Sequence, residues 1–362
     1  MDRMWPRFLA AGWFLVATSA AFGQMAVGVP QAPAAPAAVA QPCSTGTCTT
    51  GCDPCAGRCD PCCFCNWQVY GDFLFIRPRS TEIPYAVPID GAIGAGAAPV
   101  QIGRTGIVDP DYEPAFRVGF ARALDDCASI GASYTYFRSD TADTIDAGNG
   151  LLRAMVLHPG TPDAAADYLT ANANFSIDYD LADIDYRHVF IRRDNYCVNW
   201  LLGLRYAHIG QEFNSEFIGQ VREVANTEIT FDGGGIRVGL EGQRINPCNG
   251  LLVYGKGAAS FVAGEFNANY FQGSDQDPSI VDTSYKAGRV ITMLDFELGA
   301  GWQSSNGRIR LTAGYMVNSW MNMLKTADYI RGVQANDYRG LDFAGENTMT
   351  FDGFVTRAEY RW

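Results

Sequence analysis

Lysine and histidine are scarce in this chain of 362 residues, and arginine supplies most of the positive charge. The formal net charge is -12, and no basic stripe or cluster stands out along the sequence. Since binding to a phosphate backbone needs a basic surface, this composition excludes nucleic acid as a partner. The three histidines, His158, His188 and His208, leave few candidates for a general base.

Long apolar runs are missing after the first 23 residues. At the N-terminus, Arg3 and Arg7 precede or flank an apolar segment, Phe8 to Gly23, that ends in small residues. This pattern is typical of a secretory signal peptide, and we expect cleavage after Gly23 or a few residues earlier. An uncleaved anchor is the alternative, although the run is short for a bilayer span. We therefore expect an exported protein without a later transmembrane helix.

Three further segments follow the signal peptide at 1–23. Residues 24–42 form an Ala/Pro-rich linker without periodicity, which predicts an extended tether. Residues 43–65 form a Cys-rich segment that we place in the periplasm. Residues 66–362 form the main body of the protein.

The main body is dominated by long stretches in which apolar and polar residues alternate. Between Val290 and Trp302, apolar side chains including Leu298 share one face, whereas Asp295 and Glu297 lie on the other. Alternation over this length predicts a strand longer than most strands of soluble proteins. A strand between lipid and a wet lumen has this pattern.

The spacing of these strands predicts how they are connected. We expect strands near 67–77, 113–124, 128–139, 175–192, 196–210, 229–243, 250–265, 288–302, 307–321 and 348–362. Short turns at 125–126, 193–195, 244–249 and 303–307 alternate with long segments at 78–112, 140–174, 211–228, 266–287 and 322–347. Short periplasmic turns and long external loops are the layout of an outer-membrane barrel.

We therefore predict an all-β fold, a transmembrane antiparallel up-and-down β-barrel of about 10 strands. The alternative number is about 12, if 211–228 contains another hairpin. A secreted antiparallel sandwich is the alternative fold. The last predicted strand ends at the aromatic residue Trp362. In this it resembles the C-terminal assembly signal of bacterial outer-membrane barrels, which also ends in an aromatic residue. We expect outer-membrane lipid and the barrel assembly machinery to be partners.

Several blocks of the main body resemble the pore-forming major outer-membrane protein family of the Legionella type, in the form found in planctomycetes. The blocks are WQVYGDFLFIRPR (67–79), FRVGFARALDDCASIGASYTYF (116–137), YDLADIDYRHVF (179–190), GLRYAHIG (203–210) and IRVGLEG (236–242). The resemblance implies an outer-membrane β-barrel porin and supplies no catalytic residues. It does not cover the Cys-rich segment.

Charged residues on the inward-facing parity of the strands are candidates for the lining of a pore. They are Asp72, Arg117, Arg205, Arg237, Glu241, Arg289, Asp295, Glu297, Arg308, Arg310, Arg357, Glu359 and Arg361. Opposed arginines and carboxylates either line a water path or pair and plug a narrow barrel. A barrel of ten to twelve strands is narrow, and its width is closer to that of barrels filled by side chains than to that of open channels.

The function that we predict is passive diffusion of small hydrophilic solutes or ions through the barrel. The alternative is a non-conducting barrel that anchors surface loops and periplasmic crosslinks, with a structural or adhesive role. An outer-membrane hydrolase is a further alternative, but the sequence has no G-x-S-x-G motif, and the acidic pairs Asp183/Asp185 and Asp125/Asp126 are expected near strand ends. We predict no catalytic site, cofactor or metal.

Eleven cysteines are the last unusual feature of the sequence, and export permits them to form disulfides. The pairs in the Cys-rich segment are too closely spaced for a zinc ribbon, although a metal knuckle or free thiols are alternatives. Cys127, Cys197 and Cys248 each lie at a predicted periplasmic turn. We expect bonds between the segment and these turns, or between two chains in a disulfide-linked homo-oligomer. The disulfide candidates are Cys43, Cys48, Cys52, Cys55, Cys59, Cys62, Cys63, Cys65, Cys127, Cys197 and Cys248.

Overall fold

The computed structural model describes residues 67–92, 99–193, 195–246, 249–337 and 347–362. The predicted signal peptide, linker and Cys-rich segment lie outside this range. So does Cys248. Within the described part of the chain, no helix is long and apolar enough to cross a membrane.

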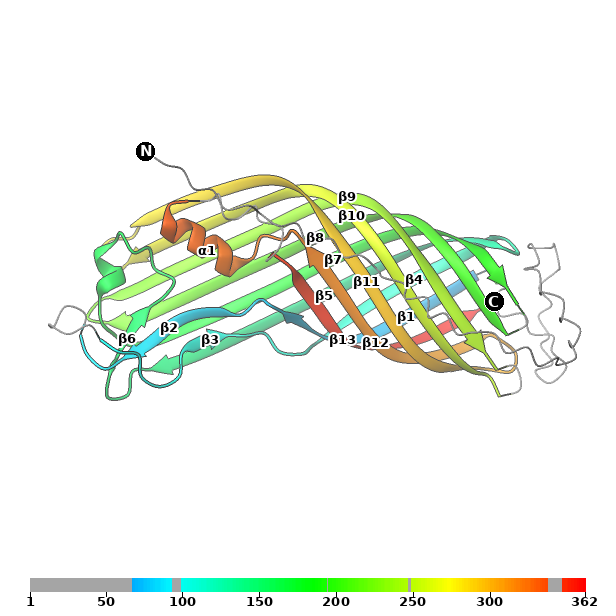
Figure 1. Cartoon of the computed structure of the whole chain (residues 1–362), viewed down its shortest axis with the longest axis horizontal. Helices are drawn as coiled ribbons and strands as arrows, with labels where there is room; N and C mark the ends of the chain where they lie inside the picture. Colours follow the sequence, from blue (N-terminus) through cyan, green and yellow to red (C-terminus); the bar gives the residue numbers. More distant parts are fainter. Residues whose placement is uncertain (1–66, 93–98, 194, 247–248, 338–346) are drawn as a thin grey trace, which may run out of the picture. The chain divides into compact units, whose positions relative to one another are not determined.

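A closed ring of 10 antiparallel strands forms the body of the protein (Figure 1). In ring order the strands are β1 (Trp67–Arg79), β4 (Glu113–Asp125), β5 (Ala128–Asp146), β7 (Tyr168–Arg192), β8 (Tyr196–Gly219), β9 (Arg222–Ile245), β10 (Leu251–Ser274), β11 (Val281–Gln303), β12 (Ile309–Met321) and β13 (Met349–Arg361). The first and last strands close the ring, with Gln68 paired to Arg361. The prediction of a ten-stranded barrel is confirmed, and the ring does not have the 12 strands of the alternative.

The two faces of each strand differ as the alternation predicts. On β11, Val290, Phe296 and Leu298 point outward, and Leu298 is 74% exposed. Ile291 and Glu297 point inward and are buried. Exposed apolar side chains therefore surround the barrel, as the lipid-facing surface of a transmembrane barrel requires.

The strand ends that flank the predicted short turns lie at one end of the barrel, which we call the turn end. There, the main chains of Trp67 and Trp362 donate to each other's carbonyls at 3.1 and 3.0 Å. In outer-membrane barrels the short turns face the periplasm. The opposite end, which we call the extended end, carries the tips of the longest strands (left in Figure 1).

Strands β7 to β11 run far beyond the apolar band. The segments 211–228 and 266–287, which we expected to be long loops, are mostly strand. Here the pattern inverts, because Phe213 and Phe217 are buried inward while Glu212 and Asn214 face outward. Outside a membrane, the outer face of a sheet meets water and the inner face packs a core. The prediction of loops was wrong because we assigned strands only where one face was apolar and lipid-facing, whereas the outer face of these segments is polar.

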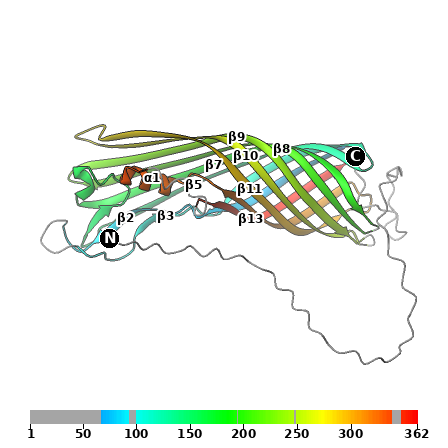
Figure 2. The ribbon, with the colours of Figure 1, turned by 45° about the horizontal axis from the view of Figure 1, so that its top comes forward.

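Shorter elements belong to this extended half, where Figure 2 shows α1, β2 and β3 beside the long strands. They are β2 (Ile83–Ile89), β3 (Gly106–Val108), β6 (Leu151–Ala154), the 3-10 helix η1 (Pro162–Ala165) and α1 (Thr326–Ala335). The small β2–β3–β6 sheet joins β7 through Leu152 and Tyr168. Helix α1 ends at Asn336, whose left-handed φ of 52° is a common way to stop a helix.

Helix α1 is attached to the strands by buried hydrogen bonds. The side chain of Gln211 on β8 donates to the Leu324 carbonyl at 2.8 Å and accepts from the Thr326 hydroxyl at 3.1 Å. The Tyr329 hydroxyl donates to the carbonyl of Ala268 on β10 at 3.2 Å. The described first part of the connection between β12 and β13 therefore folds back into the extended half.

Cys127 and Cys197 lie close together at the turn end. Both are buried against Val189, whose main-chain N–H donates to the Cys127 carbonyl at 2.9 Å. The expectation that all three turn cysteines share one end of the barrel also involves Cys248, which lies outside the described residues.

Candidate functional site

The lumen of the barrel at the height of the apolar band is filled with charged side chains, which we call the ionic layer. They project inward because they share the inward-facing parity of their strands. The cations are Arg117, Arg187, Arg205, Arg237, Lys256 and Arg357. The carboxylates are Asp72, Asp183, Asp185, Glu241, Asp295 and Glu297. The two sets are equal in number, so the layer as a whole is close to neutral.

One group of contacts crosses the lumen between distant strands. Arg117 on β4 donates to Asp72 on the adjacent β1 at 2.5 Å and to Glu297 on β11 at 2.8 Å. Strands β1, β13 and β12 lie between β4 and β11 in the ring. Asp72 also accepts from Arg357 on β13 at 2.7 Å. These side chains bridge opposite parts of the wall.

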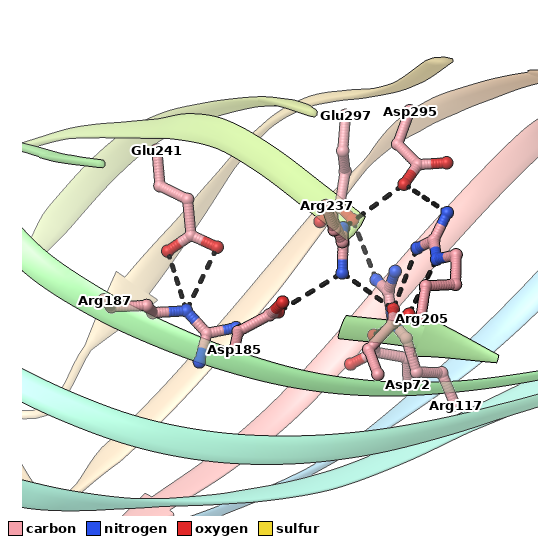
Figure 3. A network of polar contacts seen from close by, with 10 residues as sticks. Asp72, Arg117, Asp185, Arg187, Arg205, Arg237, Glu241, Asp295 and Glu297 are labelled. Carbon is pink, nitrogen blue, oxygen red and sulfur yellow. Dashed lines mark hydrogen bonds and ion pairs between the residues drawn. The ribbon is translucent and has the colours of Figure 1, made fainter. Parts of the chain in front are cut away.

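A second group centres on two arginines and two aspartates (Figure 3). Arg205 on β8 binds Asp183 on β7 at 2.6 Å and reaches Asp295 on β11 at 2.9 Å. Arg237 on β9 lies 2.7 Å from Asp183 and 3.2 Å from Asp295. Each carboxylate is held by both guanidinium groups, which is how charges are accommodated where they cannot be fully hydrated.

The ionic layer continues towards the turn end. Arg187 lies 3.2 Å from Asp185 and 3.4 Å from Glu241. Dashed lines in Figure 3 mark the contact between Arg187 and Glu241. Lys256 on β10 approaches Glu297 at 3.3 Å. Every cation of the layer therefore has at least one carboxylate within 4 Å.

Two cavities lie along the lumen in this region. The one nearer the turn end has a volume of about 100 Å³ and reaches Arg310, Glu359 and Arg361. The other has a volume of about 70 Å³ and extends among the ionic layer to Asn318. The same five side chains, Tyr70, Arg187, Glu241, Lys256 and Arg357, line both cavities. Polar cavities of this size hold several water molecules.

Above the ionic layer, four aromatic side chains close the lumen, and we call them the aromatic layer. They are Phe137, Tyr179, Trp320 and Phe351, and each is 0% exposed. The Tyr179 and Trp320 rings lie 5.5 Å apart, although four strands separate β7 from β12 in either direction around the ring. Phe351 contacts both rings, at 4.9 and 5.7 Å. This layer continues into the apolar core beneath α1.

Most of the predicted pore-lining residues point into the lumen. Asp72, Arg117, Arg205, Arg237, Glu241, Asp295, Glu297 and Arg357 belong to the ionic layer, and Arg310, Glu359 and Arg361 line the cavity near the turn end. Arg310 donates to Gln243 at 2.7 Å, and Arg361 binds Glu359.

Two predicted residues lie elsewhere. Arg308 is exposed because β12 begins only at Ile309, so the expected parity does not apply in the turn. Arg289 is buried, but it lies beyond the ionic layer, with its guanidinium 5.7 Å from the centre of the Phe266 ring.

Other members of the ionic layer were missed in the sequence. Asp183 and Asp185 were expected to be solvated near strand ends, and this was wrong, because β7 extends from Tyr168 to Arg192 and both aspartates are buried in it. Their alternation with Ala182 and Ile184 was the available signal. Lys256 carries a weaker signal because glycines flank it.

The three histidines are dispersed. His208 points outward, and its ring lies 2.9 Å from Asp232, which also accepts from the Tyr206 hydroxyl at 2.7 Å. His188 stacks on Trp200 with ring centres 5.8 Å apart, and His158 lies 3.2 Å from Asn336. Among the described residues, no group of three or more His, Cys, Asp or Glu side chains is arranged to hold a metal ion.

Comparison with known families decides the identity of the chain. The model of the Legionella pneumophila major outer membrane protein precursor family matches residues 60–360. The chain belongs to this family. It is an outer-membrane β-barrel protein, and the resemblance seen in the sequence blocks is confirmed. No curated protein sequence matches the chain.

Solved structures of other outer-membrane barrels are similar over most of the chain. The outer membrane protease OmpT from Escherichia coli is 11% identical, with a TM-score of 0.44 over 82% of this chain and 97% of its own. A Pseudomonas aeruginosa FadL homologue is 9% identical, with a TM-score of 0.23 over 82% of this chain and 90% of its own. The loop L8 deletion mutant of a Vibrio cholerae outer membrane protein is 9% identical, covers 82% and 100%, and has a TM-score of 0.13.

Proposed function

We propose that this family member is a pore for small hydrophilic solutes or ions that is closed in the described conformation. The observation that carries this proposal is the pair of polar cavities that share lining residues inside the barrel wall. Ionised side chains beside water-sized cavities are what a conducting lumen needs. Apolar side chains would fill a purely structural barrel of this width without burying charges.

The closure of the pore lies at the aromatic layer. Since Trp320 and Phe351 are fully buried and both contact the Tyr179 ring on the opposite wall, no solute passes this level without their movement. Both residues lie next to the connection that carries α1, because β12 ends at Met321 and β13 begins at Met349. Displacement of α1 would free the layer, and we infer that it opens the pore.

The charge balance of the ionic layer bears on selectivity. Its cations and carboxylates are equal in number and face one another. The electric field therefore points across the pore, and the lumen carries no large excess of either charge. We therefore expect weak selectivity between small anions and cations.

Recording from purified protein in planar bilayers tests this proposal. We expect rare, brief conductance steps from the natural protein and frequent ones from Trp320→Ala and Phe351→Ala, which remove rings from the aromatic layer. Trp302→Ala is the matched control, because Trp302 faces outward on β11 and is 43% exposed. If none of the four proteins, each shown to be folded, gave conductance steps, the pore would be excluded.

A non-conducting anchor is the second candidate, and the packed core of the extended half favours it. The aromatic layer is continuous with buried residues of α1 such as Tyr329 and Ile330. In this case the strands present a rigid surface outside the membrane. Aromatic-layer variants would then lose stability without gaining conductance.

We propose further that the chain is not an enzyme. Support comes from the histidines, since the hydroxyl that contacts the His208–Asp232 pair belongs to Tyr206, on the outward face of the barrel. Nucleophilic catalysis needs a hydroxyl or thiol in a site that binds substrate. Assay of the natural protein and His208→Ala against casein and short-chain esters tests this. Hydrolysis lost in the variant would overturn it.

The remaining partners are also proposals. We expect the barrel assembly machinery to recognise the last strand, which ends at Trp362, and we expect disulfides to join the Cys-rich segment to the barrel or to a second chain. The exposed aromatic ring of Trp362, 52% accessible at the turn end, supports the first of these.

A further inference from the structure

The outer wall of the barrel has a groove near its turn end. It spans β8, β9, β10 and β11 and has a volume of about 650 Å³. Tyr196, Arg244 and Leu298 line it, and its floor includes Gly242, Gly255 and Ala300. These side chains share the outward-facing parity of their strands, so the groove opens towards the lipid.

Small residues create this groove. On β10 the consecutive outward positions beyond Val253 are Gly255, Gly257 and Ala259. A side chain added at Gly255 would come within 3.3 Å of Leu298, which leans over it. A side chain added at Gly242 on β9 would meet nothing within 4 Å. The groove therefore has space on the side of β9 and an apolar wall on the side of β11.

One cation stands at the end of the groove. Arg244 on β9 is exposed, pairs in register with Val253 and Tyr196, and forms no ion pair with any described residue. Two other outward-facing arginines have partners, since Arg79 binds Asp352 at 2.7 Å and Arg122 lies over the Trp67 ring at 5.3 Å. Arg244 is thus a positive charge at the level where lipid phosphates lie.

We propose that this groove binds one phospholipid of the periplasmic leaflet, with an acyl chain along the glycines and the phosphate on Arg244. Charge complementarity identifies the occupant, because an apolar channel beside one guanidinium matches an acyl chain attached to one phosphate. Arginine binds phosphate through parallel N–H donors, and Tyr196, which pairs with Arg244 in register, lines the same groove.

Native mass spectrometry of the purified full chain tests the site, with phosphatidylglycerol as the probe. We expect one retained lipid on the natural protein. Arg244→Gln and Gly242→Leu should each weaken retention about tenfold, the first by removing a charge-assisted hydrogen bond and the second by filling the groove. Dioleoylglycerol, which has the chains but no phosphate, should bind weakly to all of these proteins.

Matched controls come from the opposite wall. Gly71→Leu adds the same side chain on the outer face of β1, where an added atom also meets nothing within 4 Å. Arg122→Gln removes an outward-facing arginine near the same end. If the controls and the groove variants lost lipid equally, the retained lipid would not be bound specifically in the groove, and the proposal would be overturned. A change from dimer to monomer in Gly242→Leu would also overturn it, and would make a second copy of the chain the occupant.

This inference does not depend on the pore. Conductance is measured through the lumen, whereas the groove lies on the outside of the wall, so either proposal can fail alone.

Discussion

Arg117 on β4 and Glu297 on β11 form an ion pair of 2.8 Å across the lumen, although three strands lie between them in the ring. Most side-chain pairs in a sheet join neighbouring strands. A pair that crosses the interior instead fixes the distance between two parts of the wall. The width of this barrel is therefore set partly by its ionic layer.

Glu297→Gln should destabilise the protein markedly. The change leaves Arg117 and Lys256 without one of their carboxylate partners, and breaking a buried pair costs on the order of 3 kcal/mol. Urea unfolding in detergent measures the change. Glu265→Gln is the control, because the Lys286–Glu265 pair is exposed and 3.9 Å apart, and its loss should cost less than about 0.5 kcal/mol. Equal effects of the two changes would contradict a structural role for the ionic layer.

Gln211→Ala should loosen helix α1 without unfolding the barrel. Its side chain is 2% exposed and binds both Leu324 and Thr326, so its removal leaves buried polar groups without partners at a cost of about 1–3 kcal/mol. Hydrogen exchange of residues 324–336 should accelerate about tenfold or more. Asn214→Ala, on the outward face of the same strand, is the control and should leave this exchange unchanged.

Glu223→Gln should stabilise the extended end above neutral pH. Burial, reinforced by Asp163 and Asp275, raises the pKa of the Glu223 carboxyl to about 7. A carboxyl whose pKa is raised on folding resists ionisation, so stability is highest below its usual pKa and falls as the pH rises to about 7. Thermal unfolding at pH 5 and pH 8 should differ less in the variant, by on the order of 1 kcal/mol after solvent screening. An unchanged pH profile would rule out this carboxyl as the cause.

Disulfide mapping should find Cys127 and Cys197 protected from alkylation before reduction if both form the disulfides that we expect at the turn end. We expect peptides from the Cys-rich segment to be attached to at least one of them. Non-reducing electrophoresis then separates bonds within one chain from bonds between two chains. Alkylation of either cysteine in the unreduced, unfolded protein would contradict the assignment.

The membrane-spanning half of the fold could be predicted because lipid imposes a strict rule. The alternation at Val290–Trp302, with apolar residues on one face, predicts an outward face in contact with lipid, and the structure agrees. The turn boundaries near Asp125 and Gln303 were also correct, since both residues end their strands. In each case a single physical requirement determines the pattern.

The extended half could not be predicted in the same way. Segments such as 266–287 alternate with the opposite sense, since Phe266 and Tyr270 face a core and Glu265 faces water. Polar outer residues are also common in loops, so composition alone does not separate the two. The aromatic layer was missed for a related reason, because Tyr179 and Trp320 meet only when the ring closes.

The pairing of Gln68 with Arg361 also constrains how the protein reaches its native state. Strands β1 and β13 stand at opposite ends of the sequence, so the seam between them forms only after the last residues have been synthesised and exported. Contacts of such long sequence separation make folding slow. An unclosed sheet in lipid would leave unpaired backbone groups along two edges, each at a cost of several kcal/mol. The barrel therefore closes only when the final strand is present. A chain truncated before Met349 should accumulate in the periplasm as a substrate for proteases.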